Sequence, residues 1–170
     1  TGNFAILDFG AQNTDLALYT NNKQKAVRAF KLGSQNITEN IAQTLQVDTA
    51  FAESLKIHAA FVAPEEQIPA YAQHLIQNNY IHQTEFDPEL IANAALTALR
   101  PLITSVKQTL TALNRQENIY PEKIYLTGRA SKLLGFSQYL SHALQIEVEP
   151  LRPPIQCPGV AHAYDFPWVA

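Results

Sequence analysis

The spacing of apolar residues changes near Gly33, and this change limits the chain to folds that combine a sheet with helices. Before Gly33, short apolar runs separated by turn residues predict three strands, at 4–8, 14–20 and 25–32. The alternation in 14–20 is imperfect, which is typical of a strand covered on both faces. After Gly33, apolar residues recur every three or four positions, as on one face of a helix. The pattern predicts a mixed α/β fold.

The longest helical stripe follows Asp87-Pro88, a pair that suits the N-cap and first turn of a helix. Pro101 lies inside this stripe and lacks the amide hydrogen that a helix needs. We therefore expect a kink at Pro101, or two helices that meet there. The remaining expected elements are a helix after Gly33-Ser34, a short helix capped by Asp48, a helix at about 66–79, a strand at 123–127, a helix at about 131–144, a strand at 146–148 and an irregular, proline-rich tail from Pro150 to Ala170.

Composition excludes several classes of function. The net charge of −3 provides no general basic field, so nucleic acid is not expected as a partner. The single cysteine, Cys157, excludes an internal disulfide framework and fits a reducing compartment. The five histidines lack the spacing of a zinc site, and no apolar run approaches the roughly 20 residues of a membrane helix. The sequence contains no methionine, so we expect a piece of a longer protein.

Two glycine-containing loops, far apart in the sequence, suit the binding of a phosphorylated ligand. The first is Asp8-Phe9-Gly10-Ala11-Gln12-Asn13-Thr14, between two expected strands. Gly10 admits close approach of the backbone to a phosphate, and a carboxylate such as Asp8 can hold a hydrated cation. The second is LTGRASKLLGFSQYL, residues 126–140, in which a strand leads through Gly128 toward a helix. Backbone N–H groups at such a junction attract anions.

Taken in order, these segments resemble the actin-like ATPase superfamily, and within it the branch of the pilus-assembly protein PilM and the cell-division protein FtsA. Asp8, Gly10 and Thr14 match the Asp-x-Gly-x-x-x-Thr pattern of the family's second phosphate loop. The helix that ends Ala-Glu-x-x-Lys, here Ala52-Glu53-Ser54-Leu55-Lys56, is also similar to a family segment. Residues 126–140 resemble the family's adenosine loop. The resemblance covers roughly 4–57 and 89–149, within the second half of a family member.

The resemblance implies a site for ATP and Mg²⁺. Asp8 would hold the metal through water, while Gly10, Ala11 and Thr14 would face the β- and γ-phosphates. Glu53 and Lys56 would flank the ribose and base, although both residues are equally consistent with a solvated helix face. Gly128 would let the backbone pass beneath the adenosine.

Two departures from the family pattern predict a weakened nucleotide site. Arg129 and Ala130 follow Gly128 where the family usually has further glycines, and Ser34 replaces one glycine of a usual pair. The side chain of Arg129 could reach a phosphate or fill the adenosine pocket. The resemblance also implies a first lobe, which would supply the other half of the phosphate contacts. By itself, this chain is expected to be catalytically inactive.

The expected fold class is thus an actin-like ATPase (ribonuclease H-like) lobe, with a sheet subdomain at 1–33 and 112–170 and a smaller helical subdomain at 34–111. The implied function is a cytoplasmic scaffold of a type IV pilus or type II secretion platform. Its expected partners are the first lobe, inner-membrane platform proteins and other copies of itself, and its expected location is peripheral to the inner membrane. An FtsA-like division scaffold and a lobe of a sugar kinase or Hsp70-type ATPase are the alternatives.

Overall fold

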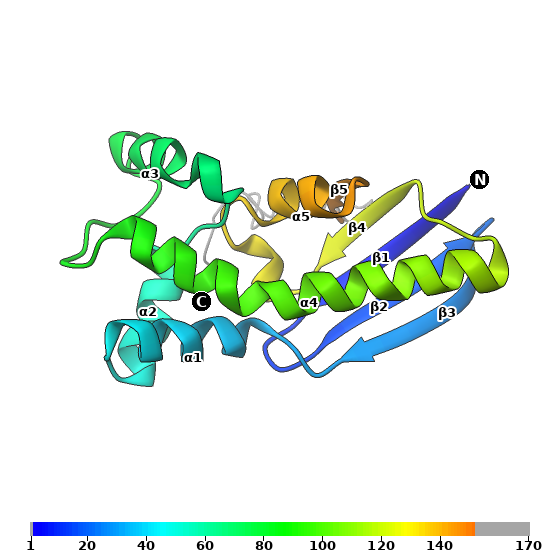
Figure 1. Cartoon of the computed structure of the whole chain (residues 1–170), viewed down its shortest axis with the longest axis horizontal. Coiled ribbons are helices and arrows are strands. Elements are labelled where there is room, and N and C mark those ends of the chain that lie inside the picture. Colours follow the sequence, from blue (N-terminus) through cyan, green and yellow to red (C-terminus); the bar gives the residue numbers. More distant parts are fainter. Residues whose placement is uncertain (1, 152–170) are drawn as a thin grey trace, which may run out of the picture.

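A computed structural model describes residues 2–151 and contains one five-stranded mixed sheet. Its strand order is β3-β2-β1-β4-β5, with β1 to β3 forming an antiparallel meander and with β4 and β5 added parallel to β1 (Figure 1). The strands are β1 (Asn3–Phe9), β2 (Thr14–Thr20), β3 (Lys23–Phe30), β4 (Lys123–Thr127) and β5 (Glu147–Pro150). The mixed α/β fold expected from the sequence is confirmed.

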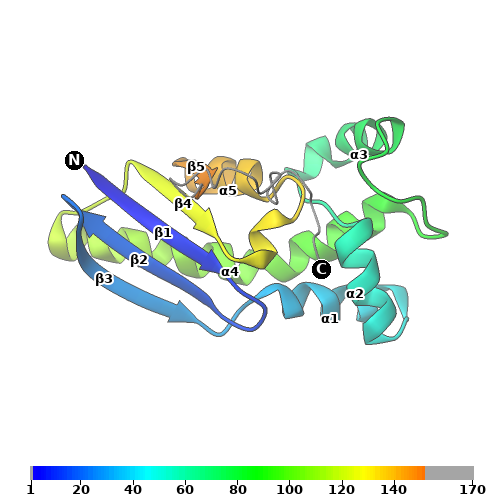
Figure 2. The same ribbon diagram turned by 180° about the vertical axis from the view of Figure 1, so that it is seen from behind.

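Helices cover one face of this sheet and extend beyond its end. They are α1 (Ser34–Leu45), α2 (Thr49–His58), α3 (Ile68–Gln77), α4 (Pro88–Glu117) and α5 (Phe136–Leu144), with short 3₁₀ turns η1 (Glu65–Gln67) and η2 (Arg129–Lys132). The second half of α4 crosses the sheet, and its first half continues among α1, α2 and α3. Figure 2 shows the opposite face of the sheet, which no helix of residues 2–151 covers.

The alternation of side chains along the strands places the core on the face toward α4 and α5. Leu7 and Leu16 face each other across β1 and β2 and are buried, together with Val106 and Leu110 of α4. On the other face, Phe4 stacks on the ring of Tyr19 with centroids 4.9 Å apart, and this face is only half-buried. The expectation that strand 14–20 is covered on both faces is therefore met on one face only.

The long helix runs through Pro101 as one element, so of the two outcomes expected there, a kink or a division into two helices, the division is wrong. Its start is as expected, because the Asp87 carboxylate accepts a hydrogen bond from the Glu89 amide at 2.9 Å. Asp48 caps α2 in the same way, accepting from the Phe51 amide at 2.8 Å. Pro101 itself is exposed, whereas its neighbour Leu102 is buried. The buried apolar stripe of α4 therefore continues beyond Pro101, although this residue has no amide hydrogen to donate.

The helix expected at 131–144 begins only at Phe136, and that boundary is a correction. Gly135 has φ +78°, in the left-handed region, and a Cβ there would lie 2.0 Å from the Val62 carbonyl oxygen. The segment before it forms η2 instead of an α-helix. Strand β3 likewise ends at Phe30 rather than at residue 32, and Pro150 belongs to β5 rather than to an irregular tail.

The subdomain division at residues 33 and 111 remains a prediction. All five strands fall within the ranges expected for the sheet subdomain, while α4 starts in the expected helical part and ends at Glu117, past the boundary. The rest of the expected tail, including Cys157, lies outside the described residues.

Candidate functional site

The two glycine-containing loops meet at one end of the sheet, where the neighbouring strands β1 and β4 both finish. Strands β1 and β4 pair in parallel, with Asp8 opposite Thr127, so both strands end at the same level. Gly128 follows with φ +92°, and a Cβ on it would lie 2.4 Å from the Phe9 carbonyl oxygen. Glycine is therefore required where the second loop passes the end of β1. The two loops are far apart in sequence and adjacent in space.

Backbone hydrogen bonds fix the first loop to the start of α1. The amides of Ser34 and Gln35 donate to the carbonyl oxygens of Gly10 and Ala11, at 3.0 and 2.8 Å. This approach requires Gly33, because a Cβ there would lie 2.3 Å from the Ala11 oxygen. The loop is thus held by the first amides of a helix, which have no partners within the helix itself.

Thr14 supports this loop from within the fold. Its side chain is fully buried, and its hydroxyl donates to the Leu32 carbonyl oxygen at 2.6 Å. The bond joins the end of the first loop to the segment that leads into α1. The hydroxyl would have to leave Leu32 before it could face a phosphate, so the role expected for Thr14 stays a prediction.

A cavity of about 310 Å³ lies where this loop meets the first turns of α1 and α2. It brings together three residues expected from the sequence, Ala11, Glu53 and Lys56. The other residues of its wall are Ser34, which was noted only as a departure from a glycine pair, and Gln35, Thr38, Thr49 and Ala50, which were not expected there. Most of these residues lie in the first turns of α1 and α2. The available signal for them in the sequence was that Ser34 directly follows Gly33, where the helical pattern begins.

A compact polar network forms one wall of the cavity. The ammonium of Lys56 donates to the Glu53 carboxylate at 2.7 Å and to the Thr38 hydroxyl at 2.9 Å. The Thr38 hydroxyl in turn donates to the same carboxylate oxygen of Glu53. The Lys56 side chain is only 12% exposed, so it is not a freely solvated group on a helix surface. Glu53 is 46% exposed and faces the cavity.

The network keeps Glu53 ionised. Partial burial by itself would raise its pKa, but the hydrogen bonds from Lys56 and Thr38 and the attraction of the Lys56 ammonium outweigh burial. The pKa of Glu53 therefore lies below its ordinary value. At neutral pH the cavity carries a carboxylate whose charge is balanced by a nearly buried ammonium.

Asp15 is a second carboxylate at the loops that sequence analysis missed. Asp8 and Asp15 are directly opposite each other in the β1–β2 register, and both are exposed. Side chains at opposite positions lie on one face of the sheet, and like charges placed there repel. A cation near both carboxylates would relieve this repulsion. The register of the β1–β2 hairpin was the available signal, because it pairs Asp8, the first residue of the loop, with Asp15, the residue after Thr14.

Residues 2–151 contain no cluster of three or more histidine, cysteine or acidic side chains that could hold a metal ion directly. The water-mediated magnesium contact expected for Asp8 stays a prediction. The described segment also has no helix of the length and apolarity needed to cross a membrane.

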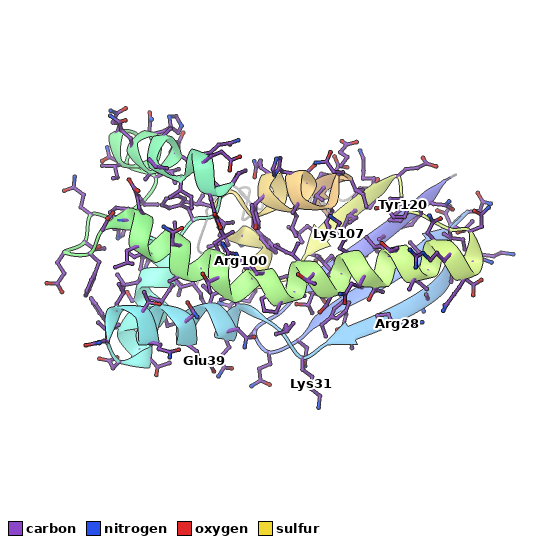
Figure 3. The ribbon with its side chains drawn as sticks, viewed as in Figure 1. Arg28, Lys31, Glu39, Arg100, Lys107 and Tyr120 are labelled. Carbon is purple, nitrogen blue, oxygen red and sulfur yellow. The ribbon has the colours of Figure 1, made fainter. Side chains whose placement is uncertain are left out.

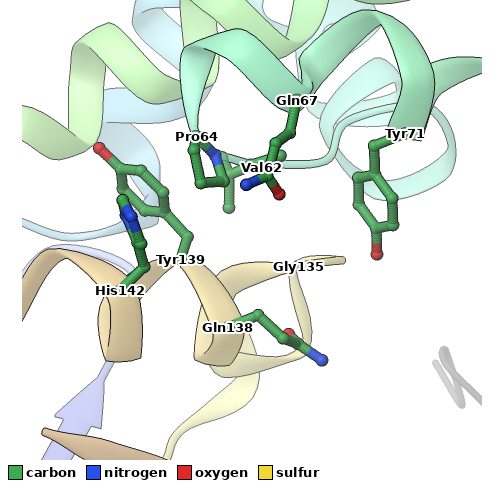
Figure 4. A pocket seen from close by; sticks show the side chains of 9 residues that line it. Val62, Pro64, Gln67, Tyr71, Gly135, Gln138, Tyr139 and His142 are labelled. Atoms are coloured by element: carbon green, nitrogen blue, oxygen red, sulfur yellow. The ribbon is translucent and has the colours of Figure 1, made fainter. Parts of the chain in front are cut away.

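Arg129, the residue expected to reach a phosphate or to fill the adenosine pocket, is exposed at the start of η2. It lines neither the cavity above nor a second one of about 300 Å³ between η1–α3 and α5. The second cavity is lined by Tyr71, Tyr139 and His142 among others (Figure 4). Part of its wall comes from the segment 126–140, but it includes none of the residues to which the sequence assigned a role in the nucleotide site.

Known structures define the class of protein that has this architecture. MreB5 of Spiroplasma citri bound to ADP is 15% identical, with a TM-score of 0.66, and the match covers 89% of this chain and 49% of that one. The PilM–PilN type IV pilus biogenesis complex is 27% identical, with a TM-score of 0.64 over 88% of this chain and 35% of the matched chain. The chain has the fold of an actin-like ATPase lobe.

The family follows from sequence comparison. The family model for cell division protein FtsA matches residues 5–164, and the chain belongs to that family. Cell division protein FtsA of Buchnera aphidicola subsp. Baizongia pistaciae is 25% identical over 159 residues, which is 90% of this chain and 37% of the relative. The chain therefore spans little more than a third of that relative, and the PilM/FtsA resemblance is confirmed.

Replacing Gly33 by alanine tests the close packing of α1 against the first loop. The new Cβ would meet the Ala11 backbone, so we expect a loss of about 2 kcal/mol or more in the free energy of unfolding, measured with urea. The matched control is Gly2→Ala, whose Cβ would meet only the flexible Glu122 side chain and should cost under about 0.5 kcal/mol. Equal effects of the two substitutions would contradict the packing.

The Glu53 network should make stability depend on pH. Because the pKa of Glu53 is lower in the folded state than its ordinary 4.5, its ionisation stabilises the fold above that value. This contribution is lost as pH falls through the lowered pKa. Glu53→Gln should therefore cost about 0.5 kcal/mol at pH 7, and the cost should vanish in acid. The exposed Glu66→Gln is the control, and a pH-independent cost of Glu53→Gln would contradict the network.

Proposed function

We propose that this chain is the nucleotide-facing second lobe of an actin-like scaffold and that Mg-ATP binds between it and a first lobe. The observation that carries the proposal is the cavity where the first loop meets the starts of α1 and α2. Its wall combines loop backbone, hydroxyl groups and a balanced Glu53–Lys56 pair. Such a mixture suits a ligand that has both phosphates and a sugar.

We assign the phosphate end of the nucleotide to the first loop. The backbone of Gly10 and Ala11 faces the β- and γ-phosphates, and Thr14 keeps the loop in place through Leu32. Asp8 and Asp15 hold the hydrated Mg²⁺ from the adjacent end of the β1–β2 hairpin. Their opposite positions in the hairpin support this role, because a divalent cation offsets the repulsion between the two carboxylates.

The adenosine end is assigned to α2 and the second loop. Glu53 faces the cavity with an ionised carboxylate and accepts hydrogen bonds from ribose hydroxyls. Lys56 is engaged by Glu53 and Thr38, so it acts by positioning that carboxylate beside the base. The Gly128 backbone passes beneath the adenosine. Arg129 is exposed and takes the place of a usual glycine, which weakens the site.

The cellular role that we propose is a scaffold for a type IV pilus or type II secretion platform. The likeness to PilM in its complex with PilN, at 27% identity, supports a partner among platform proteins of the inner membrane. The scaffold would lie on the cytoplasmic side, held to the membrane by these partners, and would also contact its own first lobe and further copies. An equally supported candidate is a division scaffold, because the FtsA family model matches residues 5–164.

An enzymatic role is the less favoured alternative. A sugar kinase or an Hsp70-type ATPase would share this lobe, because one fold can carry different sites. A kinase would need a catalytic base that faces its substrate from the first lobe. A scaffold needs the nucleotide only to hold the two lobes together. Sequencing and solving the first lobe would distinguish the two, since a substrate pocket with such a base would support the enzyme.

Calorimetric titration with Mg-ATP tests the proposal. Because a first lobe supplies half of the phosphate contacts, this chain alone should bind Mg-ATP more weakly than about 1 mM and show no ATPase activity. Joined to its first lobe, it should bind at least about tenfold more tightly, a gain of about 1.4 kcal/mol. Asp8→Asn and Asp15→Asn should each reduce that gain, whereas Asp87→Asn, at the cap of α4, should not. Micromolar binding by this chain alone would refute the two-lobe site.

A further inference from the structure

Strand β3 forms an open edge of the sheet. It lies at the end of the strand order and pairs, among the described residues, with β2 alone. Strand β3 runs from Lys23 to Phe30, and all of its residues except Ala26 and Phe30 are exposed. An edge strand presents backbone N–H and C=O groups that another extended segment can pair with. The edge is thus available to an added strand.

Four of the twelve lysines and arginines of the chain lie along this edge, with no acidic residue among them. Lys23, Lys25, Arg28 and Lys31 lie on or next to β3, and the sequence has no acidic residue between Asp15 and Glu39. None of the four cations forms an ion pair within residues 2–151. In Figure 3, Lys31 extends away from the ribbon below the end of β3. A chain with a net charge of −3 therefore has one cationic edge.

Cationic and apolar side chains are mixed along this edge. Arg28 is opposite Leu16 and so lies on the α4 side, where its guanidinium donates to the Val27 carbonyl oxygen at 2.8 Å. Val27 is opposite Ala17 on the other side and is 46% exposed. Ala26 and Phe30 lie on the same side as Arg28, and the register shifts next to Lys25, so a strand added beside β3 would meet both cationic and apolar side chains. A segment that contains both acidic and apolar side chains matches this mixture.

We propose that the β3 edge binds an extended acidic segment of a partner protein by strand addition. Backbone pairing supplies affinity, and the cations of β3 select acidic side chains. The proposal goes beyond the nucleotide site, since none of the four cations lines the cavity. A segment with both acidic and apolar residues is favoured over an anionic membrane because a lipid surface cannot form strand hydrogen bonds with the unpaired backbone groups of β3.

The probe is a fluorescent synthetic peptide of alternating glutamate and valine, measured by anisotropy with the whole chain. A second peptide has the same sequence with an N-methyl group on every residue, so that it has the same charge but no amide hydrogens with which to pair as a strand. The test variant is Lys25→Gln with Arg28→Gln. The matched control is Lys107→Gln with Arg115→Gln, which removes the same charge from exposed positions on α4.

The proposal expects the first peptide to bind and the methylated one to bind at least about tenfold more weakly. The β3 variant should lose about fivefold or more in affinity, while the α4 control should change by less than about twofold. The proposal would be overturned if both variants lost affinity equally or if both peptides bound equally. It would also be overturned if neither peptide bound, and the cations of β3 would then serve only to keep the edge solvated. Charge-dependent binding to vesicles of equal parts phosphatidylserine and phosphatidylcholine, without peptide binding, would assign the edge to lipid instead.

Discussion

The parallel pairing of β1 with β4 is the constraint on which the rest of the structure depends. It joins segments from the two ends of the described chain, with Ala5 opposite Ile124 and Asp8 opposite Thr127. A parallel pair needs a long crossover, and α4 provides it by passing over one face of the sheet. Because both strands run in the same direction, the loops that follow them meet at the same end of the sheet. This register is what brings the second loop next to the first.

Close backbone contacts then give the site its shape. Gly128 passes the Phe9 carbonyl oxygen, and Gly33 passes that of Ala11, at distances that leave no room for a Cβ. The amides at the start of α1 hold the first loop from the other side. The cavity and its Glu53–Lys56 pair lie next to these contacts. The contacts of Gly33 and Ala11 therefore fix the fold of the region that borders the cavity.

Much of the fold could be predicted because local patterns determine it. Alternation and turn residues located the strands, and the caps Asp48 and Asp87 located two helix starts. Interactions distant in sequence explain the errors. Packing of the stripe around Leu102 keeps α4 continuous through Pro101, and contact with Val62 places Gly135 outside α5. Sequence motifs likewise indicated Asp8, Ala11, Glu53 and Lys56, whereas Thr38 and Asp15 emerged only from helix packing and strand register.

We expect the two loops and the starts of α1 and α2 to form one ligand site. The most direct test is a titration of ¹⁵N-labelled chain with Mg-ATP at millimolar concentrations, followed by amide chemical shifts. The account expects the largest shifts in Gly10–Asn13, Ser34–Gln35 and Gly128–Ser131. Shifts centred on the other cavity, between Tyr71 and Tyr139, with none in these loops, would contradict it.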